Sequence, residues 1–238
     1  MNPEAIMAVN EAADLWWVTA GNVQYQAVQI GDPTVDPQLE RYHEQTEELA
    51  RQAINGEIAR PEFERRMLDI TLAAIMLVFL LGSGSAPQSE ASRELAQQET
   101  IARTSVQRLS QDIYINNRFS EIEETDTQPG QTAETGIARL LARLAMWTVT
   151  LAGVYAIGQI HQPPRIVDGV EVERNFMWKL GRTVEHCSDC LRLDGQVHTA
   201  EEWRRAGIRP QSPGLECGGW NCDCRLDPVE AESQGFTF

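Results

Sequence analysis

Apolar residues recur every three or four positions along the chain as far as Gln162, and this spacing is typical of α-helices. The pattern predicts one helix over residues 4–28, a second from Pro37 to a stop at Asn55-Gly56, and a third over residues 90–122. A linker that is first acidic and then rich in Thr, Gln, Pro and Gly follows over residues 123–136. We therefore expect residues 1–122 to form a helical domain.

Two further segments are strongly apolar. One begins at Pro61 and is nearly unbroken from Leu68 to Leu81, and the other runs from Ile137 to Ile160, with Arg139 and Arg143 on one side. A membrane span needs about 20 apolar residues, and the first segment stops early at a Gly/Ser-rich connector. We expect the first to be a fully buried helix, and residues 137–162 to pack on the helical domain or on a neighbouring subunit. The two would form an antiparallel core or bury against neighbouring subunits; a membrane-active helical pair is the alternative.

The pattern changes after Gln162-Pro163-Pro164. Residues 165–174 alternate apolar and polar side chains around Asp168-Gly169, which predicts a β-hairpin. A short helix is expected from about Thr199 to Ala206, with Thr199 as its N-cap and acidic residues in its first turn. This part of the chain, residues 163–228, should be a small β-rich or α+β module. Residues 229–238 form an acidic tail, either frayed or docked onto a partner through its aromatic side chains.

All five cysteines of the chain lie within that small module. A CxxC pair can direct two sulfurs into one tetrahedral metal site, and a second close pair can complete it. Such a site also stabilises a segment that is too small to build a good core of its own. We expect a structural zinc ion, with Trp203 and Trp220 packed beside it. The favoured ligands are Cys187, Cys190, Cys222 and Cys224, with Cys217, His186 and His198 as alternates.

Other uses of these cysteines are open at this level. An odd number of cysteines makes disulfides less favoured without excluding them. A redox CxxC would normally follow a strand and open a helix in a βαβ unit, a pattern that the neighbouring sequence lacks. A metal-assisted hydrolase built from Asp189, Asp194 and the two nearby histidines is a further alternative. An all-thiolate set leaves no open coordination position, however, so we expect no enzyme here.

The acidic charge of the chain limits the kinds of partner that it is expected to bind. Its 35 acidic and 20 basic residues give a formal net charge of −15. Binding to a nucleic-acid backbone depends on Lys and Arg, so sequence-specific nucleic-acid binding is not expected. Residues 1–20 lack the features of a secretory signal, which predicts synthesis in the cytoplasm. We find no Gly-rich phosphate loop, nucleophile elbow or HExxH motif.

Residues around the cysteines resemble the C-terminal signature of phage minor head (head morphogenesis) proteins of the Mu F type. The resemblance rests on Phe176-Met177-Trp178, Glu185-His186-Cys187-Ser188-Asp189-Cys190, Leu193-Asp194-Gly195 and Asn221-Cys222-Asp223-Cys224-Arg225-Leu226. Weaker likenesses lie upstream, over residues 55–67 and 101–105. The closing motif departs from the pattern because Arg225 follows the second cysteine instead of lying between the pair. The gap from Thr104 to Trp178 is also longer than expected.

The resemblance implies a structural protein of a tailed-phage virion, made in the cytoplasm of the host. Such proteins associate with portal, capsid or neck proteins during head assembly, as homo- or hetero-oligomers. In this interpretation the protein acts by binding: its apolar helices contact neighbouring subunits and zinc fixes the shape of the C-terminal module. A membrane-active role in genome delivery and a metal-dependent enzyme remain the alternatives.

Overall fold

The computed structural model describes residues 32–116, 136–181, 186–212, 214–218, 222 and 224–236. The predicted helix over residues 4–28, nearly all of the predicted linker and Trp220 lie outside the described residues.

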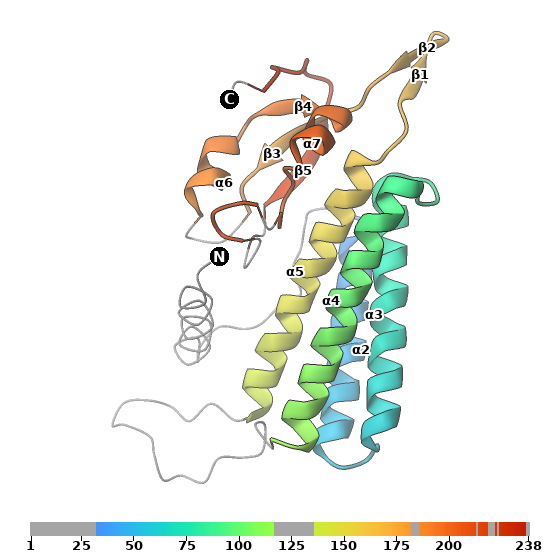
Figure 1. Ribbon diagram of the computed structural model, residues 1–238, viewed down its shortest axis with the longest axis vertical. Helices are drawn as coiled ribbons and strands as arrows, with labels where there is room; N and C mark the ends of the chain where they lie inside the picture. The colour runs from blue at the N-terminus through green and yellow to red at the C-terminus, as the bar shows by residue number, and fades with distance from the viewer. Residues whose placement is uncertain are drawn as a thin grey trace.

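Four long helices pack side by side and form one end of the molecule (Figure 1). They are α2 (Asp36–Ile54), α3 (Arg60–Ser83), α4 (Ser89–Tyr114) and α5 (Gly136–Ile160). Pro37 and Pro61 lie in the first turns of α2 and α3, where a proline removes no intrahelical hydrogen bond. The mainly α-helical fold of the N-terminal region is thus confirmed. Helix α4 ends at Tyr114, within the range predicted for it.

The bundle encloses two adjoining hydrophobic clusters, one at each end. The predicted apolar positions of α2 are confirmed, since Leu39, Tyr42, Thr46, Leu49 and Ala53 are all buried. The cluster near the α2–α3 connection also takes side chains from α3, α4 and the N-terminal half of α5. The other cluster takes side chains from the opposite ends of the same four helices.

Helices α3 and α5 run parallel, so the predicted antiparallel pairing is wrong. Phe63 and Met67 near the start of α3 share a cluster with Leu140 and Leu144 near the start of α5. At the other end, the backbones meet at two glycines, Gly82 of α3 and Gly158 of α5. A Cβ atom placed on Gly158 would lie 2.5 Å from the Phe79 carbonyl oxygen and 3.0 Å from the Gly82 Cα.

Helix α3 is not fully buried as predicted. Met76, Leu77, Leu80 and Leu81 are between 36% and 42% exposed, and together they form an apolar strip on the C-terminal half of the helix. No other described helix covers this side of α3, so part of its apolar surface is exposed. Among the described residues, α3 alone is long and apolar enough to span a membrane by length and composition. Ile101 of α4, another predicted apolar position, is also 45% exposed.

The C-terminal part forms a separate α+β unit at one end of the bundle (Figure 1). The predicted hairpin is confirmed by β1 (Arg165–Val167) and β2 (Val170–Val172), which pair antiparallel. Asp168 and Gly169 both have positive φ, of 51° and 79°, as a tight two-residue hairpin turn requires. The hairpin projects away from the rest of the molecule. Ile166, Val167 and Val170 on it are exposed.

A three-stranded antiparallel sheet forms the centre of this unit. Strand β3 (Asn175–Lys179) lies between β4 (Val197–Thr199) and β5 (Arg225–Val229). The connection from β3 to β4 contains α6 (Ser188–Leu193), and α7 (Ala200–Ala206) follows β4. The predicted helix start is confirmed: Thr199 caps α7, and its hydroxyl and the Glu202 carboxylate form a reciprocal capping box.

The tail packs on its own chain. The backbone N–H of Gln234 donates to the Val197 carbonyl at 2.9 Å, which fixes the chain beside β4. The Phe236 ring stacks on His198 with 3.6 Å between ring centres. The predicted boundary at residue 228 falls inside β5, and the described residues of the predicted tail belong to the C-terminal unit.

Polar contacts join the C-terminal unit to the bundle. Gln159, buried near the end of α5, donates to the Leu226 carbonyl of β5 at 2.9 Å. Glu94 of α4 accepts from Arg209 at 3.3 Å and lies 3.2 Å from the ring nitrogen of His161. Burial raises the pKa of Glu94, but His161 and Arg209 more than offset this effect and hold the pKa below its ordinary value.

Replacing Gly158 by Ala should force α3 and α5 apart, because the new methyl group meets α3 backbone atoms that cannot move independently. We expect the free energy of unfolding, measured by urea denaturation, to fall by about 1–3 kcal/mol. Gly214→Ala is the control, since its methyl group would meet only the Ser212 Oγ, at an ordinary contact distance of 3.8 Å. Equal stability of the two variants would contradict the close approach.

Replacing Glu94 by Gln should weaken the junction between bundle and C-terminal unit, because the nearly buried Arg209 loses its carboxylate partner. We expect a loss of about 1–3 kcal/mol at neutral pH, between the values of buried and exposed ion pairs. The contribution of Glu94 is fully present above its ordinary pKa of 4.5 and disappears as the pH falls through its lower folded-state pKa.

Urea denaturation of the natural chain and of Glu94→Gln across a pH series measures this effect. The difference in stability between them should shrink on acidification. Glu62→Gln is the control, because Glu62 pairs with Arg65 on the exposed surface of α3 and should change stability little. A difference that stays constant down to low pH would refute the assigned role of Glu94.

Candidate metal centre

The CxxC pair lies at the start of a short helix. Cys187 is the N-cap of α6, and its sulfur accepts a hydrogen bond from the Cys190 backbone N–H at 3.4 Å. The first turn of α6 is thus the tight turn that connects the two cysteines. The strands on either side, β3 and β4, are antiparallel neighbours. Helix α6 therefore does not belong to a βαβ unit of the redox type.

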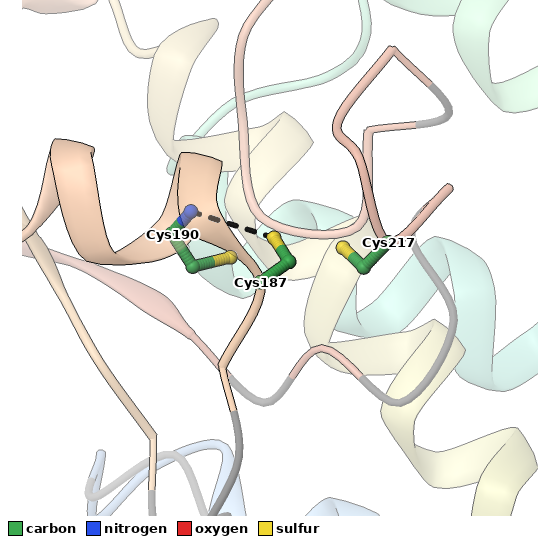
Figure 2. A group of neighbouring side chains, drawn as sticks. All are labelled: Cys187, Cys190 and Cys217. Atoms are coloured by element: carbon green, nitrogen blue, oxygen red, sulfur yellow. Dashed lines mark hydrogen bonds between the residues drawn. The ribbon is translucent and has the colours of Figure 1, made fainter.

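The structure brings all five cysteines into two overlapping groups. The sulfurs of Cys187, Cys190 and Cys217 lie within 4.8 Å of one another, and so do those of Cys190, Cys222 and Cys224. Figure 2 shows the side chains of the first group with their sulfur atoms turned toward one another. Cys190 belongs to both groups. A cluster of this kind can hold a metal ion, because thiolates at this separation suit tetrahedral coordination.

A pair of reciprocal hydrogen bonds places Cys217 in the cluster. The Glu216 carboxylate accepts from the Ser188 backbone N–H at 2.9 Å and also from the Ser188 hydroxyl. In return, the Asp189 carboxylate accepts from the Glu216 backbone N–H at 2.8 Å. Ser188 and Glu216 are adjacent in sequence to Cys187 and Cys217, and Asp189 is adjacent to Cys190. The bonds therefore hold the Cys217 loop against the start of α6.

The second group is fixed from the opposite side. The sulfurs of Cys190 and Cys222 lie 3.8 Å apart, and the Cys224 sulfur lies 3.9 Å from Nδ1 of His186. The Gln211 side chain donates to the Cys222 carbonyl at 3.2 Å and also packs against Gly153 of α5. Gln211 has a positive φ of 62°, which directs the chain into this contact. The second group is thereby tied to the bundle.

The sulfurs form part of the core of the C-terminal unit. Cys190, Cys222 and Cys224 are buried in one cluster with Trp178 and Trp203, whose ring centres lie 5.8 Å apart. The Trp203 indole N–H donates to the Phe176 carbonyl at 3.0 Å. The predicted packing of Trp203 beside the thiols is confirmed, and Trp178 joins it.

The crowded sulfurs have perturbed pKa values. Contacts with the thiols of Cys222 and Cys224, together with burial, raise the pKa of Cys190 far above its usual range. Burial raises the pKa of Cys187, but hydrogen bonds from Cys190 and Cys217 outweigh it and lower the pKa overall. Adjacent thiolates repel one another, so the cluster retains protons unless a cation takes their place. The donor set therefore fits a metal ion.

The predicted ligands are distributed over both groups. Cys190, Cys222 and Cys224 lie together, whereas Cys187 groups with Cys190 and Cys217. The expected set of four thus remains a prediction, and Cys217 is as well placed as Cys187. The spacing of Cys217 from the closing pair gave no clear signal, because its position depends on the contact between Glu216 and α6.

His198, the other alternate ligand, lies outside both groups. It is buried between Phe236 and Trp203, and its Nε2 lies 3.1 Å from the Gln196 side-chain oxygen. Burial lowers its pKa, although Glu202 nearby opposes the shift. Asp194 accepts from the Leu180 backbone N–H at 3.3 Å, and Asp189 holds the Cys217 loop. These residues therefore have structural contacts in place of the hydrolase arrangement considered above.

Comparison with known proteins gives no match to any protein-family model, curated protein or solved structure.

If the thiols bind a metal ion, its removal should loosen the C-terminal unit while α2, α3 and α4 remain folded, because the thiols lie in only one of the three hydrophobic clusters of the described residues. Free zinc at about 1,000 times its Kd would stabilise a folded site by about 4 kcal/mol. Limited proteolysis with mass spectrometry, with and without a chelator, should show new cleavages after residue 163 only.

Ser212→Ala is the control for this experiment, because Ser212 is buried in the same unit and is not part of the thiol cluster. It should respond to the chelator as the natural chain does. Proteolysis that is unaffected by the chelator in both proteins would contradict the stabilising role of the metal.

Proposed function

We propose that this protein is a structural component of a tailed-phage virion, similar to minor head proteins, whose C-terminal unit is held together by zinc. It acts by binding portal, capsid or neck proteins during head assembly and catalyses no reaction. The observation that carries the proposal is the gathering of five thiols in one cluster, three of them buried. Structural zinc sites are closed and rich in thiolate, whereas catalytic sites keep an open position.

The motifs behind the family resemblance occupy related places in the fold, which supports the proposal. The CxxC and the closing cysteine pair belong to one cluster. Leu193 is buried beside them, and Asp194-Gly195 turns the chain back to β3, where the Gly195 N–H donates to the Trp178 carbonyl at 2.9 Å. Residues that are distant in sequence but share a motif thus build one small unit.

Exposed apolar surfaces are consistent with an assembly role. The strip of Met76, Leu77, Leu80 and Leu81 on α3 and the projecting β1–β2 hairpin both expose large apolar side chains. Surfaces of this kind commonly contact other proteins. The net charge of −15 further favours partners with basic surfaces.

A membrane-active role is the second candidate, and the exposed strip on α3 is the observation that favours it. In that case α3 would leave the bundle or insert its exposed face into a bilayer. The polar start of the helix disfavours insertion, because Arg65 there pairs with Glu62 and Asp69. Flotation with liposomes separates the two roles, since an assembly protein stays in the dense fraction.

If the proposal is correct, the protein should be present in purified heads of a phage that encodes it, at a fixed ratio to the portal protein. Quantitative mass spectrometry of gradient-purified heads measures this ratio. Phage carrying Cys222→Ser should yield heads with less of the protein, because the unit that Cys222 supports is loosened. Leu191→Ser, an exposed position on α6, is the control and should leave the ratio unchanged.

Absence of the protein from purified heads would refute the virion role. Comigration with liposomes, together with absence from heads, would establish the membrane-active alternative.

A further inference from the structure

The two thiol groups share Cys190, and this sharing bears on how many metal ions the cluster holds. Each group has three sulfurs within 4.8 Å of one another. With zinc–sulfur bonds of about 2.3 Å, the sulfurs of a tetrahedral site lie roughly 3.8 Å apart. The separation of 3.8 Å between Cys190 and Cys222 agrees with this value. Each group of three is therefore compact enough to supply one face of a coordination tetrahedron after small movements of the side chains.

A single four-coordinate metal ion cannot bind all five thiols. An ion bound to Cys190, Cys222 and Cys224 can take at most one of Cys187 and Cys217 as its fourth ligand, although the hydrogen bonds between Ser188, Glu216 and Asp189 hold both of these sulfurs beside Cys190. An ion bound to the first group can likewise take at most one of the two buried thiols, Cys222 and Cys224.

Charge does not oppose a second ion. One divalent ion with three thiolates and two divalent ions with five thiolates both carry a net charge of −1, because thiols that bind no ion keep their protons. Uncompensated charge is costly in a buried cluster that also contains two tryptophans.

We propose that the cluster binds two divalent ions of the zinc type, bridged by the thiolate of Cys190. Cys187 and Cys217 complete the thiolate face of one ion, and Cys222 and Cys224 complete that of the other. Nδ1 of His186 lies 3.9 Å from the Cys224 sulfur, so a small movement of its ring would bring it to the second ion. This inference rests on the proposed metal-stabilised role of the unit.

The test uses the full chain, reduced, freed of metal and reconstituted with cadmium-113 as the probe. Native mass spectrometry counts the bound ions. Cadmium-113 NMR separates thiolate-bound ions from those held by the many carboxylates of the chain. We expect two thiolate-bound ions per chain and two resonances that are split by mutual coupling through the shared sulfur.

Variants assign the two positions. Cys217→Ser should reduce the count from two ions to one and abolish the coupling, while the resonance of the ion on Cys222 and Cys224 remains. Cys190→Ser should also abolish the coupling, because it removes the bridge. Folding of each variant is checked by the dispersion of its amide spectrum. Ser212→Ala, in the same unit, should retain two coupled ions.

The outcomes separate this inference from the proposed function. One thiolate-bound ion at saturating cadmium, or two ions without mutual coupling, would overturn the bridged pair and leave the single-metal role intact. No thiolate-bound ion at all would overturn both proposals.

Discussion

The close parallel contact of α3 and α5 is the constraint on which the rest of the structure depends. Gly82 and Gly158 lack side chains, and the backbones of α3 and α5 therefore approach so closely that a Cβ atom on either residue would clash with the other helix. Helices α2 and α4 then pack against this pair and leave one side of α3 exposed. The contact also fixes where α5 ends, and its last residues carry Gln159, which bonds to β5. The position of the thiol cluster relative to the bundle follows from this one contact.

The core of the C-terminal unit contains both hydrophobic side chains and thiols. Trp178, Trp203 and Phe176 pack there with several aliphatic side chains and with three buried sulfurs. A unit of this size buries little apolar area, and small units are often stabilised by a metal. The sulfurs come from both ends of the unit, since α6 contributes Cys190 and the approach to β5 contributes Cys222 and Cys224. A metal there closes a long loop of chain as well as filling space.

Local sequence signals predicted the local structure well. The spacing of apolar residues located α2, the Asp168-Gly169 pair located the hairpin turn, and Thr199 with Glu202 located the start of α7. Non-local features were missed for physical reasons. A helix that is apolar on every side, such as α3, carries no periodicity to show which side is covered or in which direction its partner runs. The place of Cys217 depends on Glu216 reaching Ser188, a contact that spacing alone does not reveal.

Among the described elements, helix α5 alone contributes to all three hydrophobic clusters, and this has a consequence for the order of events during synthesis. Helices α2, α3 and α4 leave the ribosome before α5, so the bundle side of α5 finds its partners at once. The residues that cover the end of α5, including every cysteine, are made after it. If the thiols bind a metal ion, its supply would therefore act on a late step of folding, after the bundle has assembled and before the end of α5 is covered.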